Sequence, residues 1–203
     1  MKRMRKISAF LCICLILATA CSVVYADNGG EEFRLRGYVN GTLRYDASFL
    51  DPHDGPGYKY RSVSLSLREG SQVKVLTQAR DASGNTWVLA EAAENGRPKR
   101  VYLLQKERGG QALINCELDS VPMEAYELES SWQCSCYEEL TLRYGPGTEY
   151  AATGFLMDTQ ENAWVVLTNG GWALVECTNA YDDGVQDVFY FTRGWVDFGQ
   201  LIY

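Results

Sequence analysis

Two short patterns occur twice in this sequence, in the same order. Thr-Leu-Arg-Tyr at residues 42–45 recurs at residues 141–144, and Gly-Pro-Gly followed three residues later by Tyr occurs at residues 55–60 and 145–150. The two recurrences differ in offset by nine residues, which is the length of the segment Asp46–Asp54 that the second copy lacks. A third similarity relates Thr-Trp-Val-Leu-Ala-Glu to Gly-Trp-Ala-Leu-Val-Glu, 85 residues further on. Internal repetition with only two copies predicts two versions of one small domain and excludes a long solenoid.

Each copy has the pattern of an all-β domain. Residues 62–67 alternate serine with Val or Leu, the period of a half-buried strand. Further strands are expected at residues 73–76, 86–90, 164–167 and 172–177, with a last strand beginning at Gly194. Turns rich in Gly, Asp and Asn separate these segments, and no segment has the period and caps of an amphipathic helix. Short strands at regular spacing favour small barrels.

The second copy carries the motifs of a known family. Leu140–Tyr150, a strand running into Gly-Pro-Gly and an aromatic residue, resembles the opening of bacterial SH3-like (SH3b) domains. Gly171–Val175 and Gly194–Val196 are similar to the two later Gly-Trp strands of that family. The first copy matches less fully, because Lys99–Val101 stands where the second Gly-Trp-Val would be expected. In the Gly-Pro-Gly turn, we expect Gly145 and Gly147 to adopt positive φ.

The resemblance implies an all-β protein of two tandem small SH3-like barrels behind an N-terminal signal peptide. We expect a first domain over residues 27–108 with an inserted loop at 46–54, a linker over 109–131, and a second domain over 132–203.

The N-terminus has the pattern of a secretory signal over residues 1–26. Four basic residues precede the apolar run Ile7–Ala18, and Val24-Tyr25-Ala26 offers small residues at the cleavage positions. A retained membrane anchor is one alternative, and lipidation at Cys21 is another, because Ala18–Cys21 resembles a lipobox. We expect a secreted or cell-surface protein of a bacterial envelope, with no transmembrane helix in the mature chain.

Charge is distributed unevenly along the chain. The formal net charge is −7, and removal of the signal lowers it to −11, with +2 over residues 27–111 and −13 over residues 112–203. A chain with this balance lacks the basic footprint that phosphate binding needs, so nucleic acid is excluded as a partner. The opposite signs of the two halves favour docking of one domain on the other.

Four cysteines remain beyond the signal: Cys116, Cys134, Cys136 and Cys177. An even number in an exported chain favours disulfides, whose pairing the sequence leaves open. Cys134 and Cys136 would point to one face of a strand, so we expect each to pair with Cys116 or Cys177 and not with the other. A four-thiolate zinc site is the alternative, but the spacing lacks two Cys-x-x-Cys knuckles. We therefore predict no metal and no cofactor.

The sequence offers no convincing catalytic group. His53 is the only histidine, lies in the inserted loop, and is interpreted as a solvated turn residue. The acidic stretch Asp182–Asp187 is interpreted as a hairpin turn, since it lacks the spacing of an EF-hand calcium loop. We therefore expect no enzyme activity.

Aromatic side chains remain as candidates for a ligand groove. SH3-like domains generally bind extended peptides along an aromatic-lined surface between two loops. For Trp172 and Trp195, filling of the barrel core is the competing interpretation. The candidate groove residues are Tyr45, Tyr58, Tyr60, Trp87, Tyr102, Tyr144, Tyr150, Trp172 and Trp195.

Two binding functions fit these observations. The resemblance implies a non-catalytic envelope module that recognises cell-wall peptide or glycan. The alternative is an envelope protein–protein interaction module, whose acidic second domain docks on a basic protein partner.

Overall fold

The computed structural model describes residues 34–35, 37–124, 133–159, 163–182 and 187–202. The chain divides into two units, residues 1–34 and 35–203, and both sheets described below belong to the second unit. The expected signal peptide and Cys21 lie outside the described residues. Within them, no helix is long and apolar enough to span a lipid bilayer.

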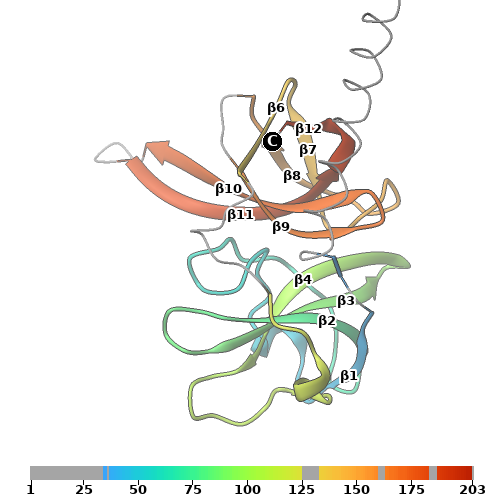
Figure 1. Cartoon of the computed structure of the whole chain (residues 1–203). Coiled ribbons are helices and arrows are strands. Elements are labelled where there is room, and N and C mark those ends of the chain that lie inside the picture. The colour runs from blue at the N-terminus through green and yellow to red at the C-terminus, as the bar shows by residue number, and fades with distance from the viewer. Residues whose placement is uncertain (1–33, 36, 125–132, 160–162, 183–186, 203) are drawn as a thin grey trace, which may run out of the picture. The chain divides into compact units, whose positions relative to one another are not determined.

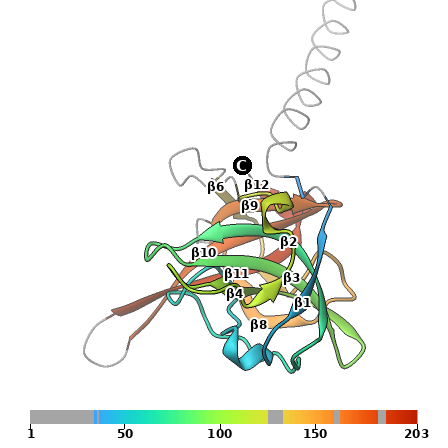
Figure 2. The ribbon, with the colours of Figure 1, turned by 90° about the horizontal axis from the view of Figure 1, so that it is seen from below.

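The first sheet has five strands in the order β4-β3-β2-β1-β5 (Figure 1). All its pairings are antiparallel, and β2, β3 and β4 form consecutive hairpins that lie side by side in Figure 2. The strands are β1 (Val39–Leu43), β2 (Gln72–Arg80), β3 (Thr86–Glu94), β4 (Arg97–Lys106) and β5 (Ile114–Asn115). Because β5 pairs with β1, the first sheet extends into the segment that the sequence assigned to the linker.

The second sheet has seven strands in the order β12-β6-β9-β10-β11-β7-β8. Beyond residue 176, β10 has only β11 as a partner, so the two continue as a ribbon past the rest of the sheet (Figure 1). The strands are β6 (Gln133–Cys136), β7 (Leu140–Arg143), β8 (Ala152–Met157), β9 (Ala163–Asn169), β10 (Trp172–Asp182), β11 (Asp187–Asp197) and β12 (Leu201–Ile202). The pairing of Asp182 with Asp187 confirms the expected hairpin, whose tip lies outside the described residues.

The all-β fold class is confirmed. Both sheets curl into half-barrels, as expected for two tandem small β-barrel domains, and the described residues contain 3-10 turns but no α-helix. The turns are η1 (Ala47–Phe49), η2 (Leu118–Ser120) and η4 (Phe198–Gln200). The sequence repeat corresponds to a repeated strand arrangement, in which β2, β3 and β4 pair in the same order as β9, β10 and β11.

Two predicted strands differ from the structure. Residues 62–67 join no ladder, although Val63 and Leu65 are buried and the serines between them are exposed, as the alternation predicts. The segment is extended and makes isolated backbone contacts instead of a ladder: Ser62 forms a bridge with His53, and the Val63 N–H donates to the Pro52 carbonyl at 2.7 Å. Gly194–Val196 ends the long strand β11 instead of beginning the last strand, which is β12.

The second Gly-Pro-Gly turn needs glycine for a reason other than the expected one, whereas in the first turn Gly57 does adopt a positive φ of 133°. Of the two glycines in the second turn, neither Gly145 nor Gly147 has positive φ. A Cβ atom on Gly145 would lie 2.0 Å from Cδ1 of Tyr150, and one on Gly55 would lie 2.1 Å from Cδ1 of Tyr60. The first glycine of each turn is therefore required because the tyrosine ring packs directly on the backbone.

The expected disulfides are not found among the described residues. Cys134 and Cys136 lie on one face of β6, as predicted, and are buried with Cys177 in the core of the second barrel. Cys116 instead packs against the core of the first barrel. The expected pairing of Cys116 with a cysteine of β6 is not made, because these residues belong to different cores.

Candidate functional site

A third apolar cluster joins the two sheets. It unites Leu76, Trp87, Leu89, Tyr102 and Leu104 of the first sheet with Val166, Leu167, Leu174 and Trp195 of the second. The members correspond by the repeat: Leu89 and Leu174 occupy equivalent positions on β3 and β10, and each is paired across its hairpin with Tyr102 or Trp195. The two barrels therefore pack through equivalent surfaces, an arrangement with approximate twofold character.

A buried polar triad lies beside this cluster on one side. Arg193 of β11 donates from Nε to Oε2 of Glu176 at 2.8 Å, and the hydroxyl of Tyr60, from the first barrel, donates to the same oxygen at 2.5 Å. Nη1 of Arg193 also donates to the hydroxyl of Tyr102 at 2.7 Å and to Glu124 at 3.0 Å. The side chains of Arg193, Glu176 and Glu124 are only 1–2% exposed.

The same triad recurs with the roles of the barrels exchanged. Arg100 of β4 donates from Nε to Oε2 of Glu91 at 2.8 Å, and the hydroxyl of Tyr150, from the second barrel, donates to that oxygen at 2.7 Å. Tyr150 is the counterpart of Tyr60 after the Gly-Pro-Gly turn. We call Tyr60–Glu176–Arg193 and Tyr150–Glu91–Arg100 the reciprocal triads. Each barrel thus supplies a tyrosine to the Glu–Arg pair of the other.

The triads shift the pKa values of their members in the directions that hold the ion pairs together. Burial alone would raise the pKa of Glu91, but hydrogen bonds from Lys74, Tyr150 and Arg100 outweigh it and lower the pKa to about 2. Burial and the hydrogen bond to Glu91 raise the pKa of Tyr150 to about 12. Burial opposes ionisation of Glu176 too, yet the charge of Arg193 and the hydrogen bond from Tyr60 lower its pKa.

Strand register corrects the alignment of the two copies. Glu91 pairs with Arg100, and Glu176 pairs with Arg193. Arg100-Val101-Tyr102 therefore corresponds to Arg193-Gly194-Trp195, and Tyr102 is the counterpart of the tryptophan that the first copy was thought to lack.

The segment that precedes each barrel in the sequence pairs with a strand of the other barrel. The backbone N–H of Glu124 donates to Gln78 of β2 at 2.8 Å, and that of Leu35 donates to Thr168 of β9 at 2.9 Å. Gln78 and Thr168 are equivalent, since they pair with Val88 and Ala173 of the repeat. The counterpart of Glu124 is therefore apolar, and Nη1 of Arg100 has no hydrogen-bond partner among the described residues.

Most of the candidate groove aromatics lie in this inter-barrel contact. Tyr60, Trp87, Tyr102, Tyr150 and Trp195 are 0–6% exposed. In this arrangement they face the other barrel or their own core, which leaves little of their rings exposed. Of the five, Tyr60 also lines the cleft described next. Tyr144 and Trp172 are half-buried, and Tyr45 and Tyr58 are exposed.

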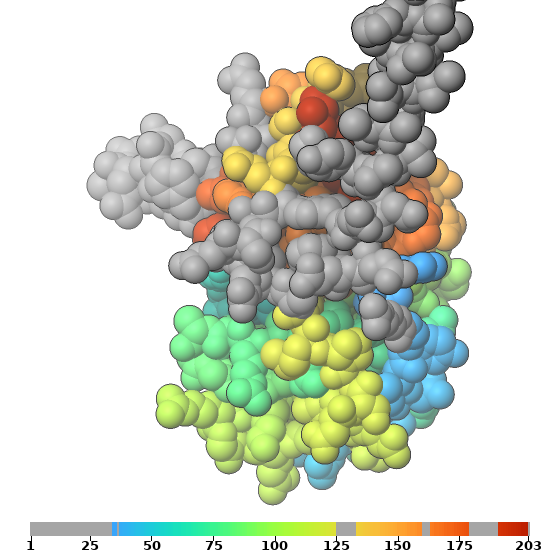
Figure 3. Space-filling model, viewed as in Figure 1, coloured from blue at the N-terminus to red at the C-terminus, as the bar shows by residue number. Residues whose placement is uncertain are grey.

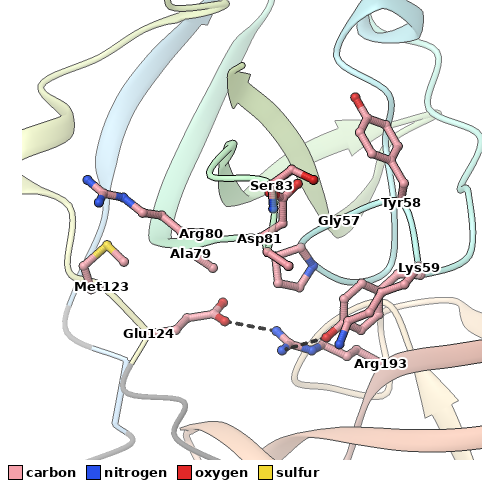
Figure 4. Close-up of a pocket in the computed structure, with 13 residues that line it drawn as sticks. Gly57, Tyr58, Lys59, Ala79, Arg80, Asp81, Ser83, Met123, Glu124 and Arg193 are labelled. Atoms are coloured by element: carbon pink, nitrogen blue, oxygen red, sulfur yellow. Dashed lines mark hydrogen bonds and ion pairs between the residues drawn. The ribbon is translucent and has the colours of Figure 1, made fainter. Parts of the chain in front are cut away.

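An open cleft of about 460 Å³ lies between two loops of the first barrel. One side is the Gly-Pro-Gly loop, Pro56–Tyr60, and the other is the end of β2 with the turn that follows it, Ala79–Ser83 (Figure 4). Met123 and Glu124 form a third wall, and Arg193 of the second barrel closes the floor. The sequence identified Tyr58 and Tyr60 as groove residues but not Glu124 and Arg193, which come from outside the two loops.

The loops that border the cleft are fixed by local hydrogen bonds. Both carboxylate oxygens of Asp81 accept, from the backbone of Ser83 and Asn85 and from Nε1 of Trp87, all at 2.9 Å. On the third wall, the backbone of Gln78 bonds to Pro122 and Glu124. Residues 122–124 therefore run along the end of β2 that does not pair with β1. Figure 3 shows the end of this segment as yellow atoms that lie against the green and blue atoms of the first barrel. The cleft is therefore preformed on rigid elements.

Charge in the cleft divides into a buried floor and an exposed mouth. Glu124 and Arg193 neutralise each other at the floor. Lys59 and Arg80 are exposed at the mouth, and Nζ of Lys59 lies 4.2 Å from the ring centre of Phe191. Asp81 also lines the cleft, but its carboxylate accepts the hydrogen bonds given above, so the exposed charged side chains of the lining are both basic.

His53 is not the solvated turn residue that the sequence suggested. It is 5% exposed, its Nδ1 lies 2.7 Å from the carbonyl oxygen of Tyr60, and its backbone bonds twice to Tyr102. Its ring meets those of Tyr58 and Trp87 edge to face. The inserted loop therefore contributes to the interior, and His53 supports the tyrosine loop of the cleft.

The second barrel carries a smaller depression of about 320 Å³ around Trp172. Its lining includes the carboxylates of Glu138, Glu139 and Asp197, with Arg143 as the one basic side chain among the lining residues. In the described part of the chain, no group of three or more His, Cys, Asp or Glu side chains is arranged to hold a metal ion.

Comparison of the chain with protein-family models, with curated proteins and with solved structures finds no match.

Proposed function

We propose that this chain is a non-catalytic, exported binding module that recognises cell-wall peptide or glycan through SH3b-like barrels. The observation that carries the proposal is the cleft between the Gly-Pro-Gly loop and the β2–β3 turn, with Tyr58 exposed on its wall. A preformed cleft that combines aromatic surface with a few convergent polar groups is the usual form of a ligand site.

The basic mouth of the cleft makes binding to an anionic cell wall compatible with the acidic net charge of the protein. An acidic protein is repelled from an anionic wall, but this repulsion is screened beyond about 8–10 Å at physiological salt. Within that range, Lys59 and Arg80 present local positive charge to carboxylates of a peptide. Of the acidic residues in the second half, Glu124 of the floor pair is the one that lines this cleft.

Two observations support a role without catalysis. Burial raises the pKa of the Cys134 thiol to about 12, opposite to the shift that activates a nucleophilic cysteine. His53 uses Nδ1 on the backbone of Tyr60, and its ring is enclosed by two aromatic side chains. Neither residue lines the cleft.

The test is sedimentation of the mature protein with purified sacculi, at low and at high salt. Tyr58→Ala removes the exposed ring of the cleft, and we expect it to weaken binding several-fold while far-UV dichroism stays unchanged. Tyr137→Ala, at a site 86% exposed in the second barrel, is the matched control and should bind like the wild type. Absence of sedimentation, or equal binding of both variants, would contradict the proposal.

The depression around Trp172 favours the alternative function, docking of the acidic second barrel on a basic protein partner. Three carboxylates beside a half-exposed indole suit a lysine or arginine side chain. Under this alternative, the protein does not sediment with sacculi. It captures a basic partner from envelope extract, and both salt and Trp172→Ala abolish that capture.

A further inference from the structure

The inserted loop is divided into a buried side and an exposed side. Ala47 and Leu50 are fully buried in the core of the first barrel. The turn between them is fixed by the bond from the Ala47 N–H to the Leu67 carbonyl at 2.9 Å, and Asp46 accepts from the backbone of Glu69 at 2.8 Å. This short turn, η1, therefore holds Phe49 outward on a rigid base; it is the light-blue coil in Figure 2.

Phe49 forms an exposed aromatic pair with Tyr45. The side chain of Phe49 is 70% exposed and that of Tyr45 is 42% exposed, and their ring centres lie 6.3 Å apart with a tilt of 49°. We call this pair the insertion platform. The second copy has Tyr144 at the position of Tyr45 but lacks the insertion that supplies Phe49, so the platform exists only in the first barrel.

A polar depression adjoins the platform. It has a volume of about 750 Å³, and Tyr45 forms part of its lining. Its other lining residues are Thr42, Leu43, Arg44, Glu69, Gly70 and Asn115. A guanidinium, a carboxylate, an amide and a hydroxyl thus line the same depression as Tyr45, and Phe49 lies next to Tyr45 outside it.

The polar groups are partly preorganised. Nη1 of Arg44 donates to the carbonyl of Ala112 at 3.1 Å, and the hydroxyl of Thr42 accepts from Gln72 at 2.8 Å. Glu69 is positioned by its backbone bond to Asp46. The side chains of Arg44 and Glu69 carry opposite charges, so the depression has no net preference for an anion or a cation.

We infer that the insertion platform and its depression bind a pyranose ring of a glycan. A pyranose has a face of C–H groups that packs on the electron-rich face of an aromatic ring, and hydroxyls at its rim that both donate and accept. Arg44 and Asn115 supply donors, and Glu69 and Asn115 supply acceptors. A peptide offers no such flat apolar face with a polar rim on every side, and a charged ligand would favour a depression of one sign.

This inference goes beyond the proposed function, because the platform shares no lining residue with the cleft. Binding of sugar at the platform does not depend on binding of any ligand at the cleft. It also gives the insertion Asp46–Asp54 a use that the duplicated fold by itself does not require.

The test is calorimetric titration of the mature protein with chitotetraose and, in parallel, with wall glycan strands from which the peptides have been removed. We expect at least one of these glycans to bind, and Tyr45→Ala combined with Phe49→Ala to lower the affinity at least tenfold. Phe49→Trp should retain binding, because it keeps an aromatic face at the same exposed position. Tyr58→Ala, in the cleft, should bind these glycans like the wild type.

Two results would overturn the inference: no binding of either glycan by the wild type, or unchanged affinity in the double variant. Binding of glycan that is lost in Tyr58→Ala and kept in the double variant would also overturn it, while supporting the cleft. Conversely, Tyr58→Ala could bind sacculi as well as the wild type does, while the double variant loses glycan binding. That result would contradict the cleft as a binding site and support the platform.

Discussion

Replacement of Tyr150 by Phe is the most direct test of how the two barrels are joined. The hydroxyl of Tyr150 is the only atom that this substitution removes, and it donates across the inter-barrel contact to Glu91 at 2.7 Å. The ring can keep its packing over Gly145. Any loss of stability therefore reports on one hydrogen bond between the barrels.

The size of the effect follows from the surroundings of Glu91. A hydrogen bond to a charged group contributes about 1.5–3 kcal/mol. Glu91 keeps its bonds to Lys74 and Arg100 after the substitution, so the carboxylate stays paired and the loss falls at the lower end, about 1.5–2 kcal/mol. With a urea dependence of about 2 kcal/mol per molar, the unfolding midpoint should fall by roughly 0.8–1 M.

The assay is urea unfolding of the mature protein followed by tryptophan fluorescence. A double-mutant cycle with Glu91→Gln isolates the contact, and we expect a coupling free energy of about 1 kcal/mol. Tyr137→Phe, at an exposed site, is the control and should change stability by less than about 0.5 kcal/mol. A coupling near zero, or a loss equal to that of the control, would refute the reciprocal contact in solution.

Two further predictions concern pH and close packing. Glu91 has its pKa lowered from 4.5 to about 2, so its contribution to stability is present above pH 4.5 and is lost as pH falls toward 2. This pKa difference corresponds to about 3.4 kcal/mol, which solvent screening of the partly exposed carboxylate reduces to about 2 kcal/mol. Glu91→Gln should flatten the stability profile over that range by this amount, and an unchanged slope would contradict the shift. Gly194→Ala places a Cβ atom 2.5 Å from Cβ of Leu142 and 3.3 Å from its Cα, so we expect a loss of about 1–3 kcal/mol in thermal or urea unfolding, whereas Gly147→Ala, which meets only the flexible Glu149 side chain, should cost less.

Local patterns in the sequence predicted the β elements well. The periodicity around Leu140 and Leu142 predicted that both leucines lie in the core. The repeat predicted that β3 and β10 are equivalent strands and that the two tyrosine loops are equivalent. The alternation at residues 62–67 correctly separated buried from exposed side chains, yet it predicted a strand where no ladder forms. Alternation reports which side chains are buried, and it does not report whether the backbone finds a partner strand.

The acidic and basic members of the candidate site could not be assigned from local patterns. Glu124 comes from the predicted linker and follows the edge of β2, and Arg193 reaches the floor of the cleft from the other barrel. These positions depend on tertiary packing between distant segments. One signal was present, however: Arg193 and Arg143 are the only basic residues in the acidic half, and two arginines among 15 acidic residues are good candidates for buried ion pairs.

The duplication explains why aromatic residues that resembled a ligand groove became an internal contact. In each copy, the tyrosine after Gly-Pro-Gly and the aromatic residue on the last long strand lie on the same side of the barrel. Two copies placed face to face bury both sets at once, and each tyrosine then finds the Glu–Arg pair of the other copy. A single barrel would leave Glu91–Arg100 or Glu176–Arg193 exposed beside an apolar surface. The ligand-facing surface therefore has to come from what distinguishes the copies: the cleft that Met123 and Glu124 help to wall, and the platform that the insertion supplies.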